Sequence, residues 1–254
     1  MRVLIIVIST LMLTAFTGPE PVPSVQQVQY QLSVSLSGEE FSRRAKEVYT
    51  EWNLEADDLN QEAFELALRG YFYMKLHAEL DNERFLTIID YSLSSKKRRL
   101  WVLDMFSGRL VFHDLVAHGK YSGNEFAVSF SNRYQSKKSC IGFLKTGSIY
   151  NGRHRRSLKL HGQEYGVNHN AFGRGIVIHG AYYVHQQYVK EDETIGRSFG
   201  CPAVSQDLVR TLVDAIEGGS CIFHYYPDES YIETSRILNS DIYVPMSEIR
   251  LLTE

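Results

Sequence analysis

The chain has 254 residues, and its 27 Lys and Arg side chains against 30 Asp and Glu give a formal net charge of −3 at pH 7. Its largest basic cluster, Lys-Lys-Arg-Arg at residues 96–99, is assigned to a solvated turn between two strands. A mildly acidic chain without a larger basic cluster gives no support for nucleic-acid binding.

The first 17 residues predict a secretory signal peptide. Arg2 precedes a mostly apolar run over residues 3–13, and small residues follow it. The run is short for a membrane span, so an uncleaved membrane anchor is only the alternative. We therefore expect a secreted or periplasmic protein of the cell envelope, which meets a membrane only through this peptide before cleavage. Residues 18–36 contain three prolines and predict an extended linker.

Residues 37–80 predict a helical segment. Ser37 and Glu40 match a capping box that opens an amphipathic helix reaching about residue 53. A second apolar stripe predicts a helix from about residue 60 to residue 77. Gly70 lies inside this second helix, where glycine costs about 1 kcal/mol relative to alanine.

Residues 81–227 predict a mainly β domain, a sandwich or partly closed barrel, because short strands alternate with glycine-rich loops. Gly142, Gly147 and Gly152 are assigned to such loops. One helix is expected to begin after Ser205, and residues 228–254 form a mixed polar tail with a strand signal at 242–244. The predicted strands of the domain cover residues 85–90, 100–104, 109–113, 125–130, 157–160, 175–178 and 220–226.

The chain has three cysteines, Cys140, Cys201 and Cys221. An odd count leaves at least one thiol free, even in an oxidising compartment. If Cys201 is the free one, Cys140 and Cys221 either form a disulfide or remain buried thiols in apolar strands.

A histidine and a cysteine carry the strongest chemical signal. His179 ends a β-branched run and precedes Gly180, while Cys201 lies between Gly200 and Pro202 in a tight turn. These are the parts of a thiol nucleophile with its base, and two adjacent strand ends would bring them within hydrogen-bond reach. A nearby imidazole and aligned backbone N–H groups would raise the thiolate population. Gly200 would let the N–H groups around Cys201 approach a substrate carbonyl as oxyanion donors.

The combination of Ile-His-Gly at 178–180 with Ser-Phe-Gly-Cys at 198–201 resembles the L,D-transpeptidase (YkuD-type) family, in particular its murein L,D-transpeptidase branch. The resemblance extends over roughly residues 60–226 through an ordered set of shorter segments. These are His118-Gly119, Phe130-Ser131-Asn132, Gly142-Phe143, Tyr150-Asn151-Gly152, Ser157-Leu158-Lys159-Leu160 and Asn168-His169-Asn170-Ala171.

The resemblance implies a YkuD-like fold for residues 81–227 and a peptidoglycan L,D-transpeptidase activity. Cys201 would attack the stem tetrapeptide and release D-alanine, His179 would be its base, and the Gly180 carbonyl would orient the imidazole. The amine of a neighbouring stem would then resolve the thioester. Peptidoglycan stem peptides are the implied partner, and neither a cofactor nor a metal is implied.

Two positions depart from the common family pattern. Phe199 stands where the family has histidine before Gly-Cys, and Ala203 stands where it has arginine or asparagine. Both agree with the murein branch, whose Pro-Ala-Val continuation the chain shares.

Four further residues are candidate substrate contacts. Arg174 and Arg197 would meet a stem carboxylate or simply be solvated. Ser198 would line the cleft or bond within the cysteine turn, and Tyr183 would floor a groove or belong to the core. A metal site of His179, His185 and Cys201 is disfavoured, because the spacing matches no common ligand set. The alternative functions are an L,D-carboxypeptidase that uses water as acceptor and a non-catalytic cell-wall-binding protein.

Overall fold

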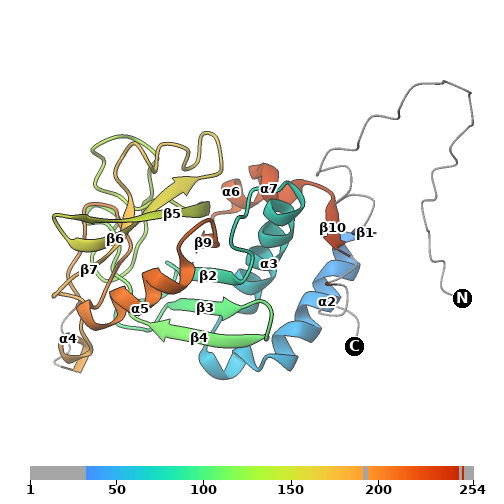
Figure 1. Ribbon diagram of the computed structural model, residues 1–254, viewed down its shortest axis with the longest axis horizontal. Helices are drawn as coiled ribbons and strands as arrows, with labels where there is room; N and C mark the ends of the chain where they lie inside the picture. The colour runs from blue at the N-terminus through green and yellow to red at the C-terminus, as the bar shows by residue number, and fades with distance from the viewer. Residues whose placement is uncertain (1–32, 191–193, 246–247, 249–254) are drawn as a thin grey trace, which may run out of the picture.

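The computed structural model describes residues 33–190, 194–245 and 248. The predicted signal peptide and residues 18–32 of the predicted linker lie outside the described residues. Among the helices that are described, none has the length and apolar character needed to cross a membrane. Figure 1 shows a curved sheet with helices on both faces and a helical end to its right.

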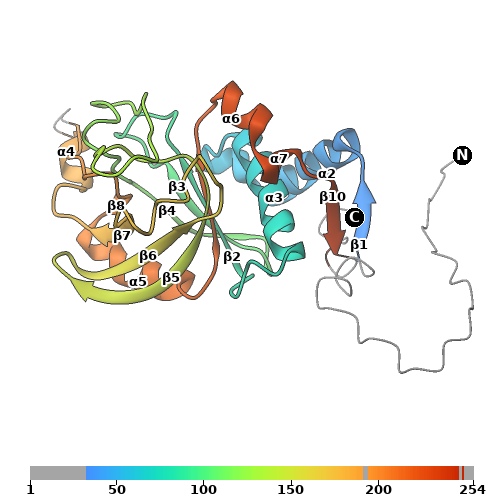
Figure 2. The same ribbon diagram turned by 90° about the horizontal axis from the view of Figure 1, so that it is seen from above.

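The fold is mainly β, as predicted, and is built on one nearly closed mixed sheet of eight strands in the order β4-β3-β2-β9-β5-β6-β7-β8. The pairs β2–β9 and β7–β8 are parallel, and the other neighbours are antiparallel. Figure 2 shows how strongly β5 and β6 curve away from β2. The strands are β2 Phe85–Asp90, β3 Leu100–Asp104, β4 Arg109–Asp114, β5 Gly142–Gly152, β6 Arg155–Gly162, β7 Val177–Gly180, β8 Ala203–Val204 and β9 Cys221–Tyr225.

Two strand predictions were wrong. Residues 125–130 form no strand, because the N–H groups of Val128 and Ser129 both donate to the Ser122 carbonyl and fold this segment back on itself. Residues 142–152 were assigned to glycine loops but form β5, the longest strand. A bulge in the β5–β6 pairing between Thr146 and Ile149 accommodates Gly147, which is how a glycine-rich segment remains in a sheet.

The long helices begin where the sequence places them. Helix α2 Gly38–Glu51 is capped by Ser37, whose hydroxyl accepts from the Glu40 N–H at 3.1 Å. A short 3₁₀ helix, η1 Leu54–Asp57, leads to α3 Gln61–Leu76, which is capped by Asn60. Helix α5 Gln206–Ile216 is capped by Ser205. The alternation of β9 separates two cores, because Cys221, Phe223 and Tyr225 pack with α3 while Ile222 packs with α5.

Gly70 shows why α3 fits the sheet. A Cβ at this position would lie 2.0 Å from Cζ of Phe143, so the glycine makes room for that ring. Phe143 in turn stacks on Phe223 with ring centroids 4.3 Å apart. The helix propensity of glycine is therefore the smaller effect here, and its missing side chain lets α3 approach β5.

The C-terminal tail forms two short helices and a strand between residues 229 and 245. The strand predicted at 242–244 is β10 Ile242–Pro245, and it pairs antiparallel with β1 Ser33–Leu36, so the last residues of the predicted linker form a strand. Two short helices that the sequence analysis missed, α6 Glu229–Thr234 and α7 Arg236–Asn239, precede β10. The buried Glu164 carboxylate accepts hydrogen bonds from Tyr231 and Ser235 of this segment, which fixes the tail to the domain.

The cysteines form no disulfide, and all three are free thiols. Cys140 and Cys221 are fully buried, so the buried-thiol alternative holds. The Cys221 thiol contacts the Met74 sulfur of α3 at 3.7 Å, which places it in the core between helix and sheet.

Candidate active site

The parallel pair β7–β8 brings the cysteine turn to the histidine. His179 is in register with Ala203, and Cys201 lies two residues before Ala203, at the entry to β8. The Cys201 S–H donates to the Gly175 carbonyl at 3.5 Å, immediately before the segment that becomes β7. In the part of the chain that the structure describes, His179 lies on β7 and Cys201 just before the neighbouring β8, without a direct hydrogen bond between the two side chains.

The His179 imidazole is held in one tautomer. It is 3 % exposed, and its Nδ1 lies 3.1 Å from the Gly180 carbonyl oxygen. A carbonyl only accepts, so Nδ1 carries the proton and Nε2 keeps its lone pair. Burial lowers the pKa of His179, and the Gly180 carbonyl only partly opposes this. Near neutral pH the ring is therefore a neutral base.

The Cys201 thiol is not activated in the resting structure. Burial raises its pKa, and the backbone hydrogen bond with Val177 and the positive charge of Arg174 only partly oppose the rise. This differs from the raised thiolate population that the sequence suggested. The resting pair is a protonated thiol and a neutral imidazole, so the proton has to move during attack on a substrate.

The turn that carries Cys201 is built by Ser198 and Gly200. The Ser198 hydroxyl donates to the Cys201 carbonyl at 2.6 Å and accepts from the Gly200 N–H at 3.0 Å. Gly200 has a φ of +122°, and a Cβ there would lie 2.7 Å from the Lys138 carbonyl oxygen. Only glycine fits this position, and Ser139 fixes it by donating to the Gly200 carbonyl at 3.1 Å.

Residues 116–119 pair with the residues on both sides of Cys201 and so hold the cysteine turn in place. Ala117 and Gly119 form isolated bridges with Ala203 and Ser198, on either side of Cys201. His118 is fully buried between these bridges, and its own carbonyl accepts from the Ser198 N–H at 2.9 Å. Any displacement of this segment would therefore move the cysteine.

Arg99 holds the supporting segment, and the sequence analysis missed it. Its guanidinium is fully buried and donates twice to the Val116 carbonyl, at 3.1 and 3.0 Å, and once to the Leu93 carbonyl at 2.7 Å. It also lies 2.7 Å from Nδ1 of His118, which must accept because arginine only donates. The assignment of residues 96–99 to a solvated turn is therefore wrong for Arg99. Its position directly before a buried strand was the available signal.

The four candidate substrate contacts have different surroundings. Arg174 donates to the carbonyls of Ser131 and Lys138, the latter at 2.5 Å, so it holds the loop beside Gly200. Arg197 is exposed and donates to the Gly123 carbonyl at 3.0 Å. Ser198 lies inside the cysteine turn.

Tyr183 is half-buried. Burial raises the pKa of its hydroxyl to about 12, and the nearby Cys201 contributes to this rise. The tyrosine therefore lies in the neighbourhood of Cys201.

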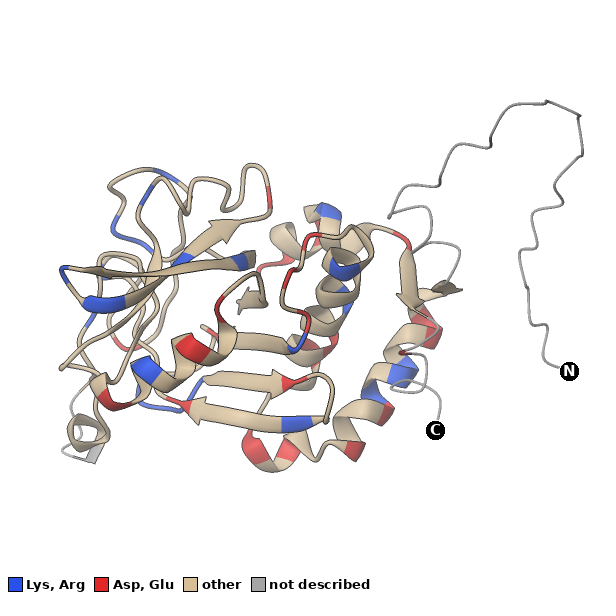
Figure 3. Ribbon diagram, in the orientation of Figure 1, with Lys and Arg blue, Asp and Glu red and all other residues tan. Residues whose placement is uncertain are grey.

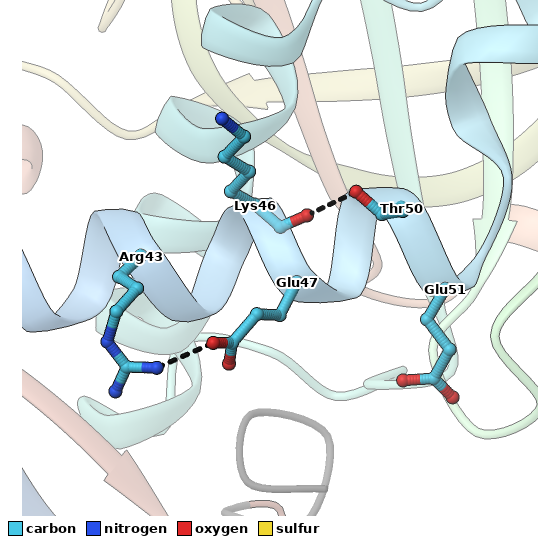
Figure 4. A pocket seen from close by; sticks show the side chains of 5 residues that line it. All are labelled: Arg43, Lys46, Glu47, Thr50 and Glu51. Carbon is cyan, nitrogen blue, oxygen red and sulfur yellow. Dashed lines mark hydrogen bonds and ion pairs between the residues drawn. The ribbon is translucent and has the colours of Figure 1, made fainter.

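No three His, Cys, Asp or Glu side chains within the described ranges are grouped so that they could hold a metal, and His185 joins no such group. A hollow of about 660 Å³ lies instead on the outer face of α2, lined by charged residues with an Arg43–Glu47 ion pair (Figure 4). It is far from the cysteine turn, since α2 and β7 lie at opposite ends of the molecule in both ribbon views. We assign no chemistry to it.

Comparison with known proteins identifies the domain. A search of curated proteins finds no match. Solved structures similar to this chain include an L,D-transpeptidase from Mycobacterium smegmatis, with a TM-score of 0.35 and 13% identity over 56% of this chain and 59% of that one. Another is an L,D-transpeptidase from Stackebrandtia nassauensis, with a TM-score of 0.35 and 11% identity over 76% of this chain and 93% of that one.

The present chain thus spans about three fifths of the length of the first of these structures. The family model of the L,D-transpeptidase catalytic domain matches residues 55–225, a range that contains the histidine strand and the cysteine turn together with the segment that supports it. With more than half of its length matched, this chain belongs to the L,D-transpeptidase catalytic-domain family.

Proposed function

We propose that this protein is a peptidoglycan L,D-transpeptidase of the cell envelope, with Cys201 as its nucleophile and His179 as its base. The observation that carries the proposal is the parallel β7–β8 pair, which sets the cysteine turn beside a buried imidazole of defined tautomer. The family match over residues 55–225 supports the same reaction. The proposal includes export of the protein, directed by the signal peptide predicted at residues 1–17.

The proposed reaction begins with neutral partners. The Cys201 thiol leaves the Gly175 carbonyl and attacks the peptide carbonyl between the L-centre of the diamino acid and the terminal D-alanine. Nε2 of His179 takes the thiol proton, and backbone N–H groups of the cysteine turn stabilise the oxyanion. The C–N bond then breaks, D-alanine leaves with the proton from His179, and a thioester remains. The amine of a neighbouring stem attacks this thioester, its proton passes to His179 and on to the departing sulfur, and the thiol is restored.

The surrounding residues have separate roles in this proposal. Arg174 and Ser198 position the turn, because their donors are already bound to backbone carbonyls. Arg197 and Tyr183 are the proposed substrate contacts: Arg197 donates to the Gly123 carbonyl from Nη1 but is exposed to a stem carboxylate, and Tyr183 lies in the neighbourhood of the thiol.

The test is incubation of the purified protein with tetrapeptide muropeptides, followed by mass spectrometry. A cross-linked dimer with release of D-alanine is expected, and Cys201→Ala should abolish both. The matched control is Cys140→Ala, which removes a buried thiol and should keep the activity. D-Alanine release that survives in Cys201→Ala would refute the proposal. A tripeptide without a dimer would assign the carboxypeptidase reaction instead.

A wall-binding protein with an inert site needs a different experiment. Because burial raises the pKa of the resting Cys201 thiol, slow labelling near neutral pH is expected for an enzyme as well. Acylation by a carbapenem separates the two, since the family resemblance implies that carbapenems acylate the active cysteine. An intact mass increased by one imipenem in the wild type, and absent in Cys201→Ala, supports the enzyme. An unmodified wild type that still sediments with cell-wall sacculi supports the binding protein.

A further inference from the structure

We propose that His154 is a positioning residue for the base His179, an inference that rests on the proposed function. The two imidazole rings are stacked, with centroids 4.1 Å apart and an interplanar angle of 23°. His154 belongs to no motif of the cysteine site, and it reaches His179 from a different part of the chain.

The β5–β6 hairpin brings His154 to this place. Gly152 of β5 pairs with Arg155 of β6, so Arg153 and His154 form the two-residue tip between the strands. Further along β6, Ser157 is in register with His179. The start of β6 therefore runs beside the base, and the tip turns the His154 ring onto the face of the His179 ring.

The stacked His154 ring further restricts the orientation of the His179 ring. The Gly180 carbonyl holds Nδ1 and so sets the rotation of the imidazole in its own plane. A ring on one face sets the tilt of that plane and excludes water from that side. Nε2 then keeps one direction, which a base needs in order to take the thiol proton and return it to a leaving amine.

The stacking also affects the charge that develops on the base. During attack His179 becomes an imidazolium, and the π-face of a neutral neighbouring ring attracts a cation. If His154 itself carries a proton, the two positive charges lie about 4 Å apart and oppose each other. Consistent with this, the charge of His154 acts to lower the pKa of His179, after the larger effect of burial. The base should therefore work best while His154 is neutral.

Other charges near β7 come from two elements. Strand β6 carries basic residues, visible as blue segments near β7 in Figure 3, and α5 carries residues of both signs. Arg156 of β6 and Asp214 of α5 form an ion pair with each other. The remaining titratable groups on these elements are Arg155, Lys159, His161, Asp207 and Arg210. Arg174 lies just before β7, and Cys201 lies in the cysteine turn. Among the described residues, His154 is the one titratable group that stacks on the His179 ring.

Two variants separate the ring from its charge. His154→Phe keeps an aromatic face and removes the ionisable ring, whereas His154→Ala removes both. The matched control is His113→Ala, because His113 also stacks on a ring, Trp101, but lies on β4 away from the site. The rate of acylation by imipenem is measured by intact mass between pH 5 and pH 9.

We expect His154→Ala to be about tenfold slower than the wild type at pH 8, with little change in the concentration dependence, and His154→Phe to stay within about twofold. The acid limb of the pH–rate profile, where the neutral His179 base is lost, should move to higher pH in both variants, because the charge of His154 no longer lowers the pKa of His179. His113→Ala should match the wild type. An unchanged rate and an unchanged acid limb in His154→Ala would overturn the inference.

A second readout keeps the inference testable if the proposed function fails. Should the wild type not be acylated, the imidazole titrations followed by nuclear magnetic resonance still report on the pair. His179 should titrate at a higher pH in His154→Phe than in the wild type, because a charge on its neighbour has been removed. An identical titration in both proteins would overturn the coupling.

Discussion

Acidification should strongly destabilise this protein at a pH where most of its carboxylates are still ionised, because two histidines are buried as neutral rings. His118 and His224 have no exposed surface. Burial lowers the pKa of each to about 4, and the charge of Arg99 adds to the effect at His118. His118 accepts from Arg99, and Nδ1 of His224 donates to the Cys140 carbonyl at 3.0 Å. Protonating either ring in the folded state would create a buried positive charge that its surroundings do not stabilise.

The size of the effect follows from linkage. An unfolded histidine titrates near pH 6.5, so at pH 4.5 the unfolded chain has bound a proton at each position and the folded chain mostly has not. For a folded pKa of about 4, this difference costs about 2.5 kcal/mol for each histidine, or about 5 kcal/mol for both. The stability is present above pH 6.5 and is lost as the pH falls toward 4. Since domains are stable by about 5–15 kcal/mol, the loss is a large fraction of the total.

Urea unfolding followed by tryptophan fluorescence at pH 7 and pH 4.5 measures this loss. In His224→Asn the amide can still donate to the Cys140 carbonyl but does not titrate, so about half of the pH dependence should disappear. His113→Asn, on the edge strand β4, serves as the matched control and should behave as the wild type. If His224→Asn loses as much stability between the two pH values as the wild type does, the reasoning is refuted.

Three other outcomes follow from the structure. Gly70→Ala should destabilise the fold by at least 1 kcal/mol in urea unfolding, because the new Cβ meets the Phe143 ring; the stabilisation that helix propensity alone predicts would contradict this. Ser198→Ala should slow acylation about 30-fold and also lower stability by about 1–3 kcal/mol, since two hydrogen bonds of the cysteine turn are lost, whereas Ser37→Ala should lower stability by about 1 kcal/mol and leave acylation intact. The iodoacetamide rate of Cys201 should still be rising with pH at pH 8.5 and should level off only above the usual thiol range, and a fast, pH-independent reaction at pH 6 would show that the resting thiol is ionised.

The features that the sequence predicted well are those decided by neighbours in the chain. Ser37, Asn60 and Ser205 begin their helices because each side chain bonds to an N–H three residues later. Short runs rich in apolar, β-branched and aromatic residues likewise predicted β2, β3 and β9. The histidine strand and the glycine-flanked cysteine turn were also singled out from the sequence, and their joint role as one site stays a prediction.

The features that the sequence missed depend on partners far away in the chain. Gly70 is determined by Phe143, and Arg99 is determined by the carbonyl of Val116 and the ring of His118. No local pattern shows that a basic residue following three basic neighbours assigned to a solvated turn would instead be buried and hold the segment behind the cysteine turn. The protonation state of the resting thiol was missed because burial, which no motif encodes, outweighs the nearby charges.

The pairing of β1 with β10 has a practical consequence for handling the protein. This two-stranded sheet lies at the end of the molecule opposite β7 and β8, as both ribbon views show. Ser33 and Pro245 are register partners there, so the chain enters and leaves the described fold at neighbouring points. Both points lie on the side of the molecule away from Cys201. A purification tag, a surface linker or a fluorescent fusion joined at either point would therefore be attached on that side. Immobilisation through these positions should leave the cysteine turn open to large, insoluble substrates.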